Sequence, residues 1–403
     1  MRLEPLIARR ISGRTAIPAA AIAVGMVVML LSIAIVRGFQ QEVSGKVSGF
    51  VGDVRVVSLT QDPHRVVYPV ILDDSLSSLL ESTPGVAHIQ PFVVKAGMLK
   101  TEEDFLATQF MGVGADYDTT FLCRYLVDGR MPRSETTESP ELLLSQYIAR
   151  TLRLHVGDKV FAYFFTEKRL RARRMRVVGI YQTHLSDYDQ VMCFTDIATV
   201  RQLHGWRSDQ VSGLDLRLQE GLDRRAFAED LHARVYALAD SIGAHRGAFS
   251  VEQLVPHTFA WLDVLDANVA MILVLMVLIA SFTIVSGLLV VMLERVGLIG
   301  LLSALGASRS QLRGIFRRFG LRLVGRAMLI GDVVAMGLAY VQMRWHVVAL
   351  DAETYYLDAV PISWSWPLFV IVNVGVLLVG GLVVYGTSFL VRRGSPAQAL
   401  RWE

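Results

Sequence analysis

The chain has 403 residues, of which 53% are hydrophobic and only 19% are charged, whereas roughly 25% of the residues of an ordinary soluble domain are charged. The formal net charge of +3 is small, which argues against a protein that binds nucleic acid through a basic surface. The mean hydropathy of +0.42 is high for a soluble protein and points to a chain partly buried in a membrane.

Four stretches are long and apolar enough to cross a membrane, for which a helix needs about 20 apolar residues. They predict spans at residues 16–37, 268–293, 319–345 and 367–391. The first stretch is longer than the apolar region of a secretory signal peptide, which has roughly 7–15 residues. No small-residue cleavage site follows it. We therefore expect a retained anchor in a multi-pass protein.

The distribution of arginine predicts the orientation, because Lys and Arg gather on the cytoplasmic side of membrane proteins. Arginines cluster in residues 1–15, 294–318 and 392–403, whereas the loop 346–366 has three acidic residues and no Lys or Arg. We therefore expect these three basic segments to be cytoplasmic. The loop 346–366 and the large segment 38–267 should lie outside.

The third predicted span carries an unusual polar load of Arg322, Arg326 and Asp332. We expect both arginines to occupy the cytoplasmic end, where their long side chains reach the lipid headgroups. Asp332 lies about one and a half helical turns further along. It should face the interior of the helix bundle or pair with an arginine.

The large external segment has the composition of a soluble α+β domain inserted between the first two membrane helices. Two of its stretches resemble β-α-β units. In the first, a helix at 73–82 precedes a strand at 86–94. In the second, a strand at 214–218 precedes a helix at 223–242, whose apolar residues recur every three or four positions, and a short strand at 248–251.

A more β-rich region lies between these two units. The sequence predicts a helix at 142–154, a turn at 155–158, and paired strands at 159–165 and 175–181. The strongly basic stretch 166–174 is interpreted as the turn that joins the strands. It is either a contact for an acidic partner or an ordinary solvated surface.

The sequence has no motif for catalysis or for nucleotide binding. It lacks the GxxxxGK[ST] loop that cradles phosphates, and it lacks GxSxG, HExxH and GxGxxG. Six histidines of the external segment are scattered without the spacing of metal ligands: His88, His155, His184, His204, His232 and His245. We therefore predict no catalytic residues, no metal and no cofactor.

Two smaller features leave alternatives open. Cys123 and Cys193 are outside any CxxC motif, and they form either one disulfide or two separately buried thiols. Asp187 and Asp189 flank Tyr188, so the stretch is either a small polar site or a loop that hydrogen-bonds to its own backbone.

The segment between the second and third spans is the most informative. Val296, Ile299, Leu302 and Leu305 lie on one side of a predicted helix, and Gly306 suits its end. Such a helix either docks into a cytoplasmic partner or only closes a hairpin between two spans. The residues that such docking would involve are Glu294, Arg295, Val296, Gly297, Ile299, Gly300, Leu302, Leu305, Gly306, Ala307 and Ser308, the last of which also suits the N-cap of the next helix.

Residues 294–308 read Glu-Arg-x-Gly-x-Ile-Gly-x-Leu-x-Ala-Leu-Gly-Ala-Ser. This pattern resembles the coupling segment of FtsX-like ABC transporter permeases, the MacB and lipoprotein-releasing (Lol) group. Five further stretches resemble that group in the same order along the chain: 6–10 with 37–39, 152–160, 178–181 with 187–189, 355–361, and 395–403. Arg322 and Arg326 depart from it, since many relatives are glycine-rich and neutral there.

The resemblance implies a permease subunit of the bacterial inner membrane that pairs with a second permease, identical or different. Two separate ATPase subunits would drive it, and the resemblance assigns coupling to these ATPases to the docking residues named above within 294–308. In the Lol branch the cargo is a lipoprotein, which passes to a periplasmic carrier. The alternatives within the group are a MacB-like efflux permease and an FtsX-like signalling permease that regulates cell-wall hydrolases. An unrelated membrane sensor is a further alternative.

Overall fold

The computed structural model describes residues 16–59, 68–133, 140–166, 169–238, 244–294, 305, 308–351 and 355–388. The chain divides into two units. The membrane unit comprises Met1–Gln41, Trp261–Leu350 and Ala359–Glu403, and the external unit comprises Glu42–Ala260 and Asp351–Asp358. The boundary between the two units falls within the first long helix, so this helix contributes to both.

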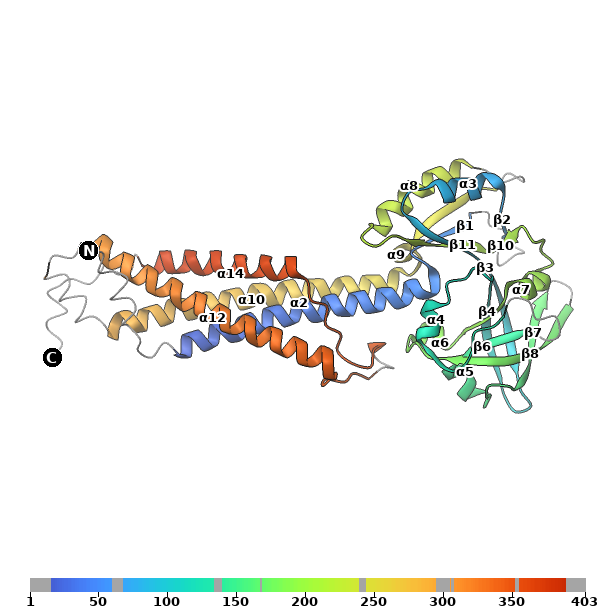
Figure 1. Cartoon of the computed structure of the whole chain (residues 1–403), viewed down its shortest axis with the longest axis horizontal. Coiled ribbons are helices and arrows are strands. Elements are labelled where there is room, and N and C mark those ends of the chain that lie inside the picture. Colours follow the sequence, from blue (N-terminus) through green and yellow to red (C-terminus); the bar gives the residue numbers. More distant parts are fainter. Residues whose placement is uncertain are drawn as a thin grey trace. The chain divides into compact units, whose positions relative to one another are not determined.

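Within the described residues, four helices are long and apolar enough to span a membrane, which confirms the four predicted spans (Figure 1). They are α2 (Ala16–Val51), α10 (Pro256–Glu294), α12 (Arg309–Trp345) and α14 (Trp366–Thr387). The 36 residues of α2 extend about 54 Å, well beyond the ~30 Å hydrocarbon core. Helices α2, α10 and α12 therefore continue past the predicted spans, because hydropathy marks the apolar part of a helix and not its ends.

The four helices share one apolar core. Residues from all of them are buried against each other: Ile22, Met26, Leu30, Ile284, Leu288, Phe316, Val324, Ala327, Val376 and Val384. Asp332 is buried in the same bundle, where the amide nitrogen of Asn373 donates a hydrogen bond to its carboxylate (3.3 Å). The prediction that Asp332 faces the bundle is confirmed, and Arg322 and Arg326 are exposed.

One part of the external unit is built from two β-α-β units, one near the start of the domain in sequence and one near its end. This confirms the two units that were predicted. Strands β1 (Val54–Ser58) and β3 (Val86–Lys100) flank β11 (Gly213–Leu218), which runs antiparallel to both. Strand β12 (Arg246–Ser250) pairs with the other edge of β1. The resulting order β12-β1-β11-β3 is that of a ferredoxin-like β-α-β-β-α-β arrangement.

Helices α3 (Asp74–Ser82) and α8 (Arg224–Ala237) pack their apolar residues against this part of the sheet (Figure 1). The side chain of Asp73 accepts a hydrogen bond from Leu76 N and so caps α3. The predicted helix 223–242 is confirmed as far as Ala237, and residues 239–243 lie outside the described part of the chain.

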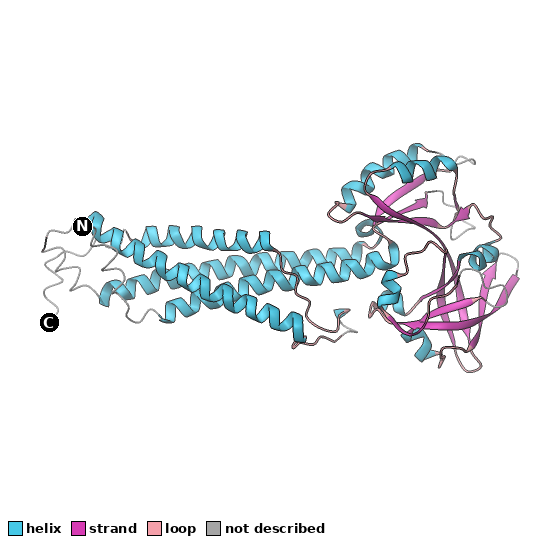
Figure 2. Ribbon diagram, viewed as in Figure 1, coloured by secondary structure: helices cyan, strands magenta, loops and turns pink. Residues whose placement is uncertain are grey.

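The remaining strands, drawn in magenta with the others in Figure 2, lie between β3 and β11 in the sequence and extend the sheet beyond β3. These strands are β4 (Phe105–Val113), β5 (Leu126–Gly129), β6 (Glu141–Ser145), β7 (Lys159–Thr166), β8 (Arg169–Tyr181) and β9 (Met192–Asp196). Short elements complete it: α4 (Thr120–Arg124), α5 (Gln146–Thr151), α6 (Ser186–Asp189), α7 (Ile197–His204), α9 (Val251–Leu254), and the separate pair β2 (Val70–Ile71) and β10 (Gln210–Val211).

Two predictions in this region are wrong. Residues 141–145 form the buried strand β6, so the predicted helix 142–154 is reduced to α5. A short, fully buried apolar run does not alternate, and periodicity cannot distinguish it from a helix. The basic stretch 166–174 is not a turn, because β8 begins at Arg169 and pairs with β7 from Thr166↔Arg169 to Phe161↔Arg174.

The structure also distinguishes between the two alternatives for the cysteines. Cys123 on α4 is an exposed free thiol, and Cys193 on β9 is a buried free thiol. They are separate thiols, although only one of them is buried. Burial raises the pKa of the Cys193 thiol well above its ordinary value, which makes it unreactive.

Candidate functional site

The distal end of α2 is embedded in the external unit. Val43, Val47 and Phe50 are at most 1% exposed, and their spacing of four and three residues places them on one face of the helix. The ring of Phe50 stacks on Tyr188 at a centroid distance of 4.5 Å. It also meets Phe121 edge-on at 5.2 Å. This aromatic cluster fixes the end of the helix within the domain.

The C-terminus of α2 is held by backbone capping and by one arginine. Gly52 adopts a positive φ of 76°, and a Cβ there would lie 2.9 Å from Cβ of Asp215. The guanidinium of Arg217, on β11, donates to the carbonyl oxygens of Ser48 (2.7 Å) and Gly49 (3.2 Å). A cation at this position satisfies helix-end carbonyls and favours the helix dipole. Helix α2 is therefore fixed to the central sheet.

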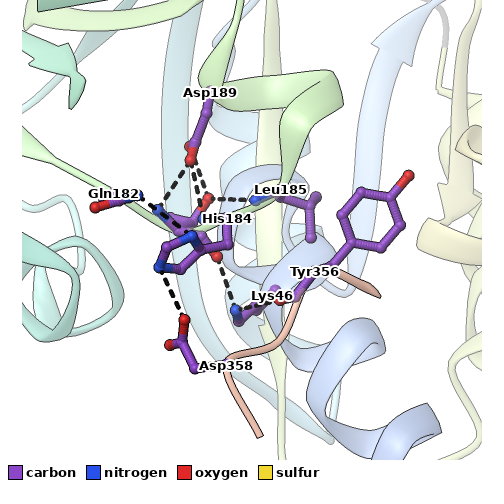
Figure 3. A network of polar contacts seen from close by, with 8 residues as sticks. Lys46, Gln182, His184, Leu185, Asp189, Tyr356 and Asp358 are labelled. Carbon is purple, nitrogen blue, oxygen red and sulfur yellow. Dashed lines mark hydrogen bonds and ion pairs between the residues drawn. The ribbon is translucent and has the colours of Figure 1, made fainter. Parts of the chain in front are cut away.

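Lys46, on the same buried stretch of α2, joins three segments that are distant in sequence (Figure 3). Its side chain is 4% exposed. The ammonium donates to the carbonyl oxygens of Thr183 (2.7 Å) and Tyr356 (2.8 Å). Thr183 follows β8, and Tyr356 belongs to the loop between α12 and α14. That loop segment is therefore attached to the external unit and, through Lys46, to α2.

A second contact fixes the same loop. Nε2 of His184 lies 3.3 Å from a carboxylate oxygen of Asp358. The amide of Gln182 points its nitrogen at Nδ1 of this ring (3.3 Å), so Nδ1 accepts and Nε2 carries the proton that faces Asp358. His184 and Tyr356 both have positive φ angles, 62° and 63°. We call Lys46, Thr183, His184, Tyr356 and Asp358 the latch.

Asp189 holds the backbone of the latch in place. Its carboxylate accepts hydrogen bonds from Thr183 N (3.0 Å), Thr183 Oγ1 (2.7 Å) and His184 N (2.9 Å). Burial raises the pKa of Asp189 above its ordinary value, and these hydrogen bonds counteract part of the shift. Asp189 therefore hydrogen-bonds to neighbouring backbone, as the second interpretation of this stretch expects, although Ser186–Asp189 forms the short helix α6 and not a loop.

The latch contains no arrangement of nucleophile, acid and base: Lys46 binds backbone carbonyl oxygens, and His184 contacts the carboxylate of Asp358. What it can do is transmit displacement between α2, the sheet and the loop. Sequence reasoning missed Lys46. Its spacing from Val43, Val47 and Phe50 was the available signal, because it places a lysine on the apolar face of the helix.

Three of the predicted coupling residues, Glu294, Leu305 and Ser308, are among the described residues. Glu294 is the last residue of α10, and Leu305 is 76% exposed. Ser308 caps α12 as expected: its hydroxyl accepts from Gln311 N (3.3 Å), and the Gln311 side chain accepts from Ser308 N (2.8 Å). The other residues assigned to coupling fall within 295–304 and 306–307, outside the described residues, so their apolar face stays a prediction.

The histidines outside the latch serve local structure. Rings of His88, His204 and His232 bind the carbonyl oxygens of Asp116 (2.7 Å), Val94 (2.9 Å) and Ala248 (3.0 Å), respectively. A carbonyl oxygen only accepts, so each ring presents an N–H to it.

Comparisons with known proteins agree with this architecture. The family described as "MacB-like periplasmic core domain" matches residues 15–234, and the one described as "FtsX-like permease C-terminal" matches residues 270–396. The chain is 24% identical to the lipoprotein-releasing system transmembrane protein LolC of Neisseria meningitidis, covering 96% of this chain and 94% of the relative. It is 21% identical to LolE of Haemophilus influenzae, covering 94% and 92%.

Among solved structures, the periplasmic region of MacB from Actinobacillus actinomycetemcomitans aligns with 53% of this chain and 95% of its own length. The sequence identity of the aligned residues is 13%, and the TM-score is 0.36.

Proposed function

The chain belongs to the FtsX-like ABC transporter permeases with a MacB-like periplasmic core domain, and we propose that within this family it releases lipoproteins from the inner membrane. Permeases of this family are multi-pass inner-membrane proteins that work with ABC ATPases. The sequence has no phosphate-binding loop of its own. Hydrolysis is therefore the task of separate ATPase subunits, and a second permease subunit completes the transporter.

The curated relatives favour the lipoprotein-releasing branch over its alternatives. Both carry the printed description "Lipoprotein-releasing system transmembrane protein", and each similarity extends over nearly the whole chain. A MacB-like efflux permease usually carries a fused ATPase domain. A signalling permease usually has a much smaller external domain than the one between α2 and α10.

One observation carries the mechanism: α2 is a single helix that starts in the membrane unit and ends inside the external unit. From α2 the chain enters β1 directly, and from β12 it enters α10 through α9. The ends of these two strands are partners, Val54 opposite Ser250. A movement of α2 or α10 would therefore displace the same end of the sheet, where β1 and β12 are paired. The latch adds the loop between α12 and α14 as a further connection.

We also propose that the β7–β8 hairpin contacts the periplasmic carrier that receives the lipoprotein. Two apolar side chains near its tip are exposed, Phe165 by 71% and Leu170 by 55%. Arg171, Arg173 and Arg174 are exposed on the adjoining part of β8. The apolar tip suits an apolar patch on the partner, because the centre of a protein interface is apolar. The arginines beside it suit acidic residues around that patch, because charges across an interface are complementary.

Reconstitution tests the proposed function. Proteoliposomes would contain the chain, its second permease, the ATPase subunits and an acylated lipoprotein, with a soluble carrier outside. We expect ATP-dependent transfer of the lipoprotein to the carrier. The Arg173→Glu/Arg174→Glu variant should reduce the transfer while ATP hydrolysis continues. Export of an unacylated cargo with no lipoprotein transfer would instead identify an efflux permease.

A further inference from the structure

Arg224, the first residue of α8, contacts the segments by which the chain enters and leaves the external sheet. Its Nε forms an ion pair with a carboxylate oxygen of Asp53 (2.9 Å), the residue directly before β1. Its Nη1 donates to the hydroxyl of Ser44 (2.8 Å), which belongs to α2. The same Nη1 lies 3.7 Å from a carboxylate oxygen of Glu252 on α9. One guanidinium therefore lies beside both the end of α2 and the segment that leads into α10.

Asp53 is itself fixed to the sheet, so the guanidinium has an anchored partner. The second carboxylate oxygen of Asp53 accepts a hydrogen bond from Leu218 N (3.0 Å), and its backbone N–H donates to the carbonyl oxygen of Leu216 (2.9 Å). Its own carbonyl oxygen accepts from Val251 N (3.0 Å), at the start of α9. These bonds hold Asp53, and through the ion pair Arg224, at the end of the sheet where β1 and β12 are paired.

The contact between Arg224 and Glu252 is incomplete. Its length of 3.7 Å exceeds the roughly 2.7–2.9 Å of a charge-assisted hydrogen bond. The other carboxylate oxygen of Glu252, Oε2, is buried and has no hydrogen-bond partner among the residues that the structure describes. A buried carboxylate oxygen without a donor is unfavourable. Glu252 would therefore be stabilised by a closer approach to the guanidinium beside it.

Arg224 can accept this closer contact without losing the others. A guanidinium carries more N–H groups than the contacts with Asp53 and Ser44 use. An approach of about 1 Å would shorten the pair with Glu252 to the length of a charge-assisted hydrogen bond. Helix shifts of roughly 1–2 Å are ordinary in proteins that switch between two states. The geometry is therefore that of a contact ready to close.

Helix α9 connects Glu252 to a membrane helix over a short distance. Val255 is the one residue between α9 and α10. Its N–H donates to the carbonyl oxygen of Val251 (3.0 Å), and its own carbonyl oxygen accepts from Phe259 N (3.4 Å). These bonds join the two helices in the manner of successive helical turns. A displacement at the start of α10 would therefore reach Glu252.

We propose that Arg224 is a positioning residue that couples α2 to α10, and that its ion pair with Glu252 closes during the ATP-driven cycle. The inference rests on the proposed function, because it names the residues through which movement passes between the two helices. With the pair closed, one guanidinium holds Ser44, Asp53 and Glu252 together, so the end of α2 and the start of α10 move as one body. With the pair open, α9 is free to shift without displacing α2.

The first test measures lipoprotein transferred per ATP hydrolysed, in proteoliposomes that hold the full-length chain, its second permease and the ATPase subunits. Glu252→Gln keeps the shape of the side chain but removes its charge, so we expect this ratio to fall about tenfold while hydrolysis continues. Arg224→Lys should keep part of the ratio, because an ammonium can hold Asp53 but lacks the planar fork. Glu229→Gln, at an exposed carboxylate of α8, is the matched control and should behave like wild type.

A purely structural role for Glu252 predicts a different result. Because the pair is open in this structure, Glu252→Gln should melt at the same temperature as wild type in one detergent. A lower melting temperature with an unchanged transfer ratio would show that Glu252 only stabilises the fold, and would overturn the proposal. An unchanged temperature with an unchanged ratio would overturn it as well.

A second measurement needs no lipoprotein. Hydrogen exchange at residues 251–255 is compared in the assembled complex without nucleotide and with ATP trapped by vanadate. We expect slower exchange in the trapped state of wild type, because the closed pair holds α9, and no such change in Glu252→Gln. Equal exchange in both states of wild type would refute the closing contact. Absence of lipoprotein transfer by wild type would instead count against the proposed function and leave this measurement to decide the contact.

Discussion

At the scale of single residues, Lys46 shows how a buried charge can serve a mechanical contact. Its ammonium binds carbonyl oxygens of residues 137 and 310 positions away in the sequence. A buried cation is tolerated only where hydrogen-bond partners replace the water that it loses. The carbonyl oxygens of Thr183 and Tyr356 in turn need the ammonium as a hydrogen-bond donor in place of water.

Lys46→Met should open the latch, because the substitution keeps an unbranched chain but removes the donor. Each carbonyl left unpaired costs about 1–3 kcal/mol. We expect faster hydrogen exchange at residues 355–358 in the full-length chain and weaker transport with ATPase binding retained. Lys95→Met, at a half-buried lysine of β3, is the matched control. Unchanged exchange at 355–358 would show that Lys46 does not hold the loop.

His204 should make part of the external unit sensitive to acid. Burial lowers its pKa to about 4 from the ordinary 6.5, and its ring donates to the carbonyl of Val94. As the pH falls from 6.5 to 4, the unfolded chain gains a proton here that the folded domain does not. Folding stability is therefore lost progressively across this window, on the order of 2 kcal/mol after allowing for solvent screening.

Glutamine cannot take up a proton, so the folding stability of the His204→Gln variant should change less with pH than that of wild type. Hydrogen exchange of α7 and β3 in the full-length chain, compared at pH 7 and pH 5, measures the difference. His155→Gln serves as control, since the His155 side chain is 86% exposed. An identical pH response in wild type and His204→Gln would refute the assignment.

At the scale of elements, α2 and the segment before α14 touch backbone to backbone. Ser363 N donates to the carbonyl oxygen of Ala34. A Cβ at Gly38 would lie 2.7 Å from the carbonyl oxygen of Pro361. Gly25, in the same helix, has open space around it. Gly38 and Gly25 therefore have the same helical backbone, but only Gly38 is in close contact with another segment.

Gly38→Ala should destabilise the membrane unit, because the added methyl group meets backbone atoms that cannot move aside cheaply. Gly25→Ala should be neutral or stabilising by up to about 1 kcal/mol, since alanine favours a helix over glycine. Thermal unfolding of both variants in one detergent compares them. Equal melting temperatures would argue that the segment around Pro361 does not pack on α2.

The elements that sequence predicted well are those with local signals. Membrane spans follow from a run of apolar residues, and the cap at Ser308 follows from Ser308 and Gln311 three positions apart. Strand β6 was mistaken for a helix because all five of its residues are buried and none marks an outer face. The latch could not be predicted, because its partners meet only after the sheet and the long helices have formed.

At the scale of the whole molecule, the proposed topology has an aromatic boundary. Phe39 meets Trp261 at 5.4 Å, and Trp364 meets Trp366 at 6.3 Å. Together with Trp345, these rings mark the ends of the membrane unit that connect to the external unit. Tryptophan favours membrane interfaces, and arginine favours the cytoplasmic side. The rings mark a boundary without distinguishing its two sides, and the arginine distribution predicts that residues 38–267 are external.

Cysteine labelling checks this orientation in intact cells. The native exposed thiol is first removed by Cys123→Ser, and Cys193 is buried. A reagent that does not cross the membrane should then label Ser134→Cys and leave Ser308→Cys unmodified. Both positions should react after the membrane is opened. Labelling of Ser308→Cys from outside would reverse the topology.

The coupling segment decides whether ATP hydrolysis reaches the external unit at all. Leu302 is predicted to lie on the apolar face with Val296 and Ile299, and such faces dock into grooves through anchors spaced three or four residues apart. Leu302→Asp would bury an unpaired carboxylate at that contact, which is strongly disfavoured. The loss should exceed the ~1.4 kcal/mol that corresponds to a tenfold weaker affinity.

We therefore expect Leu302→Asp to insert normally, to lose its ATPase on co-purification and to stop transport. Leu302→Met, which keeps the size and the apolar character of the side chain, should retain both. Hydrogen exchange of the latch should be unchanged in each variant, because the predicted topology places the latch and residue 302 on opposite sides of the membrane. If Leu302→Asp keeps its ATPase and its transport, residues 294–308 only close the hairpin between α10 and α12. The force must then enter the chain elsewhere.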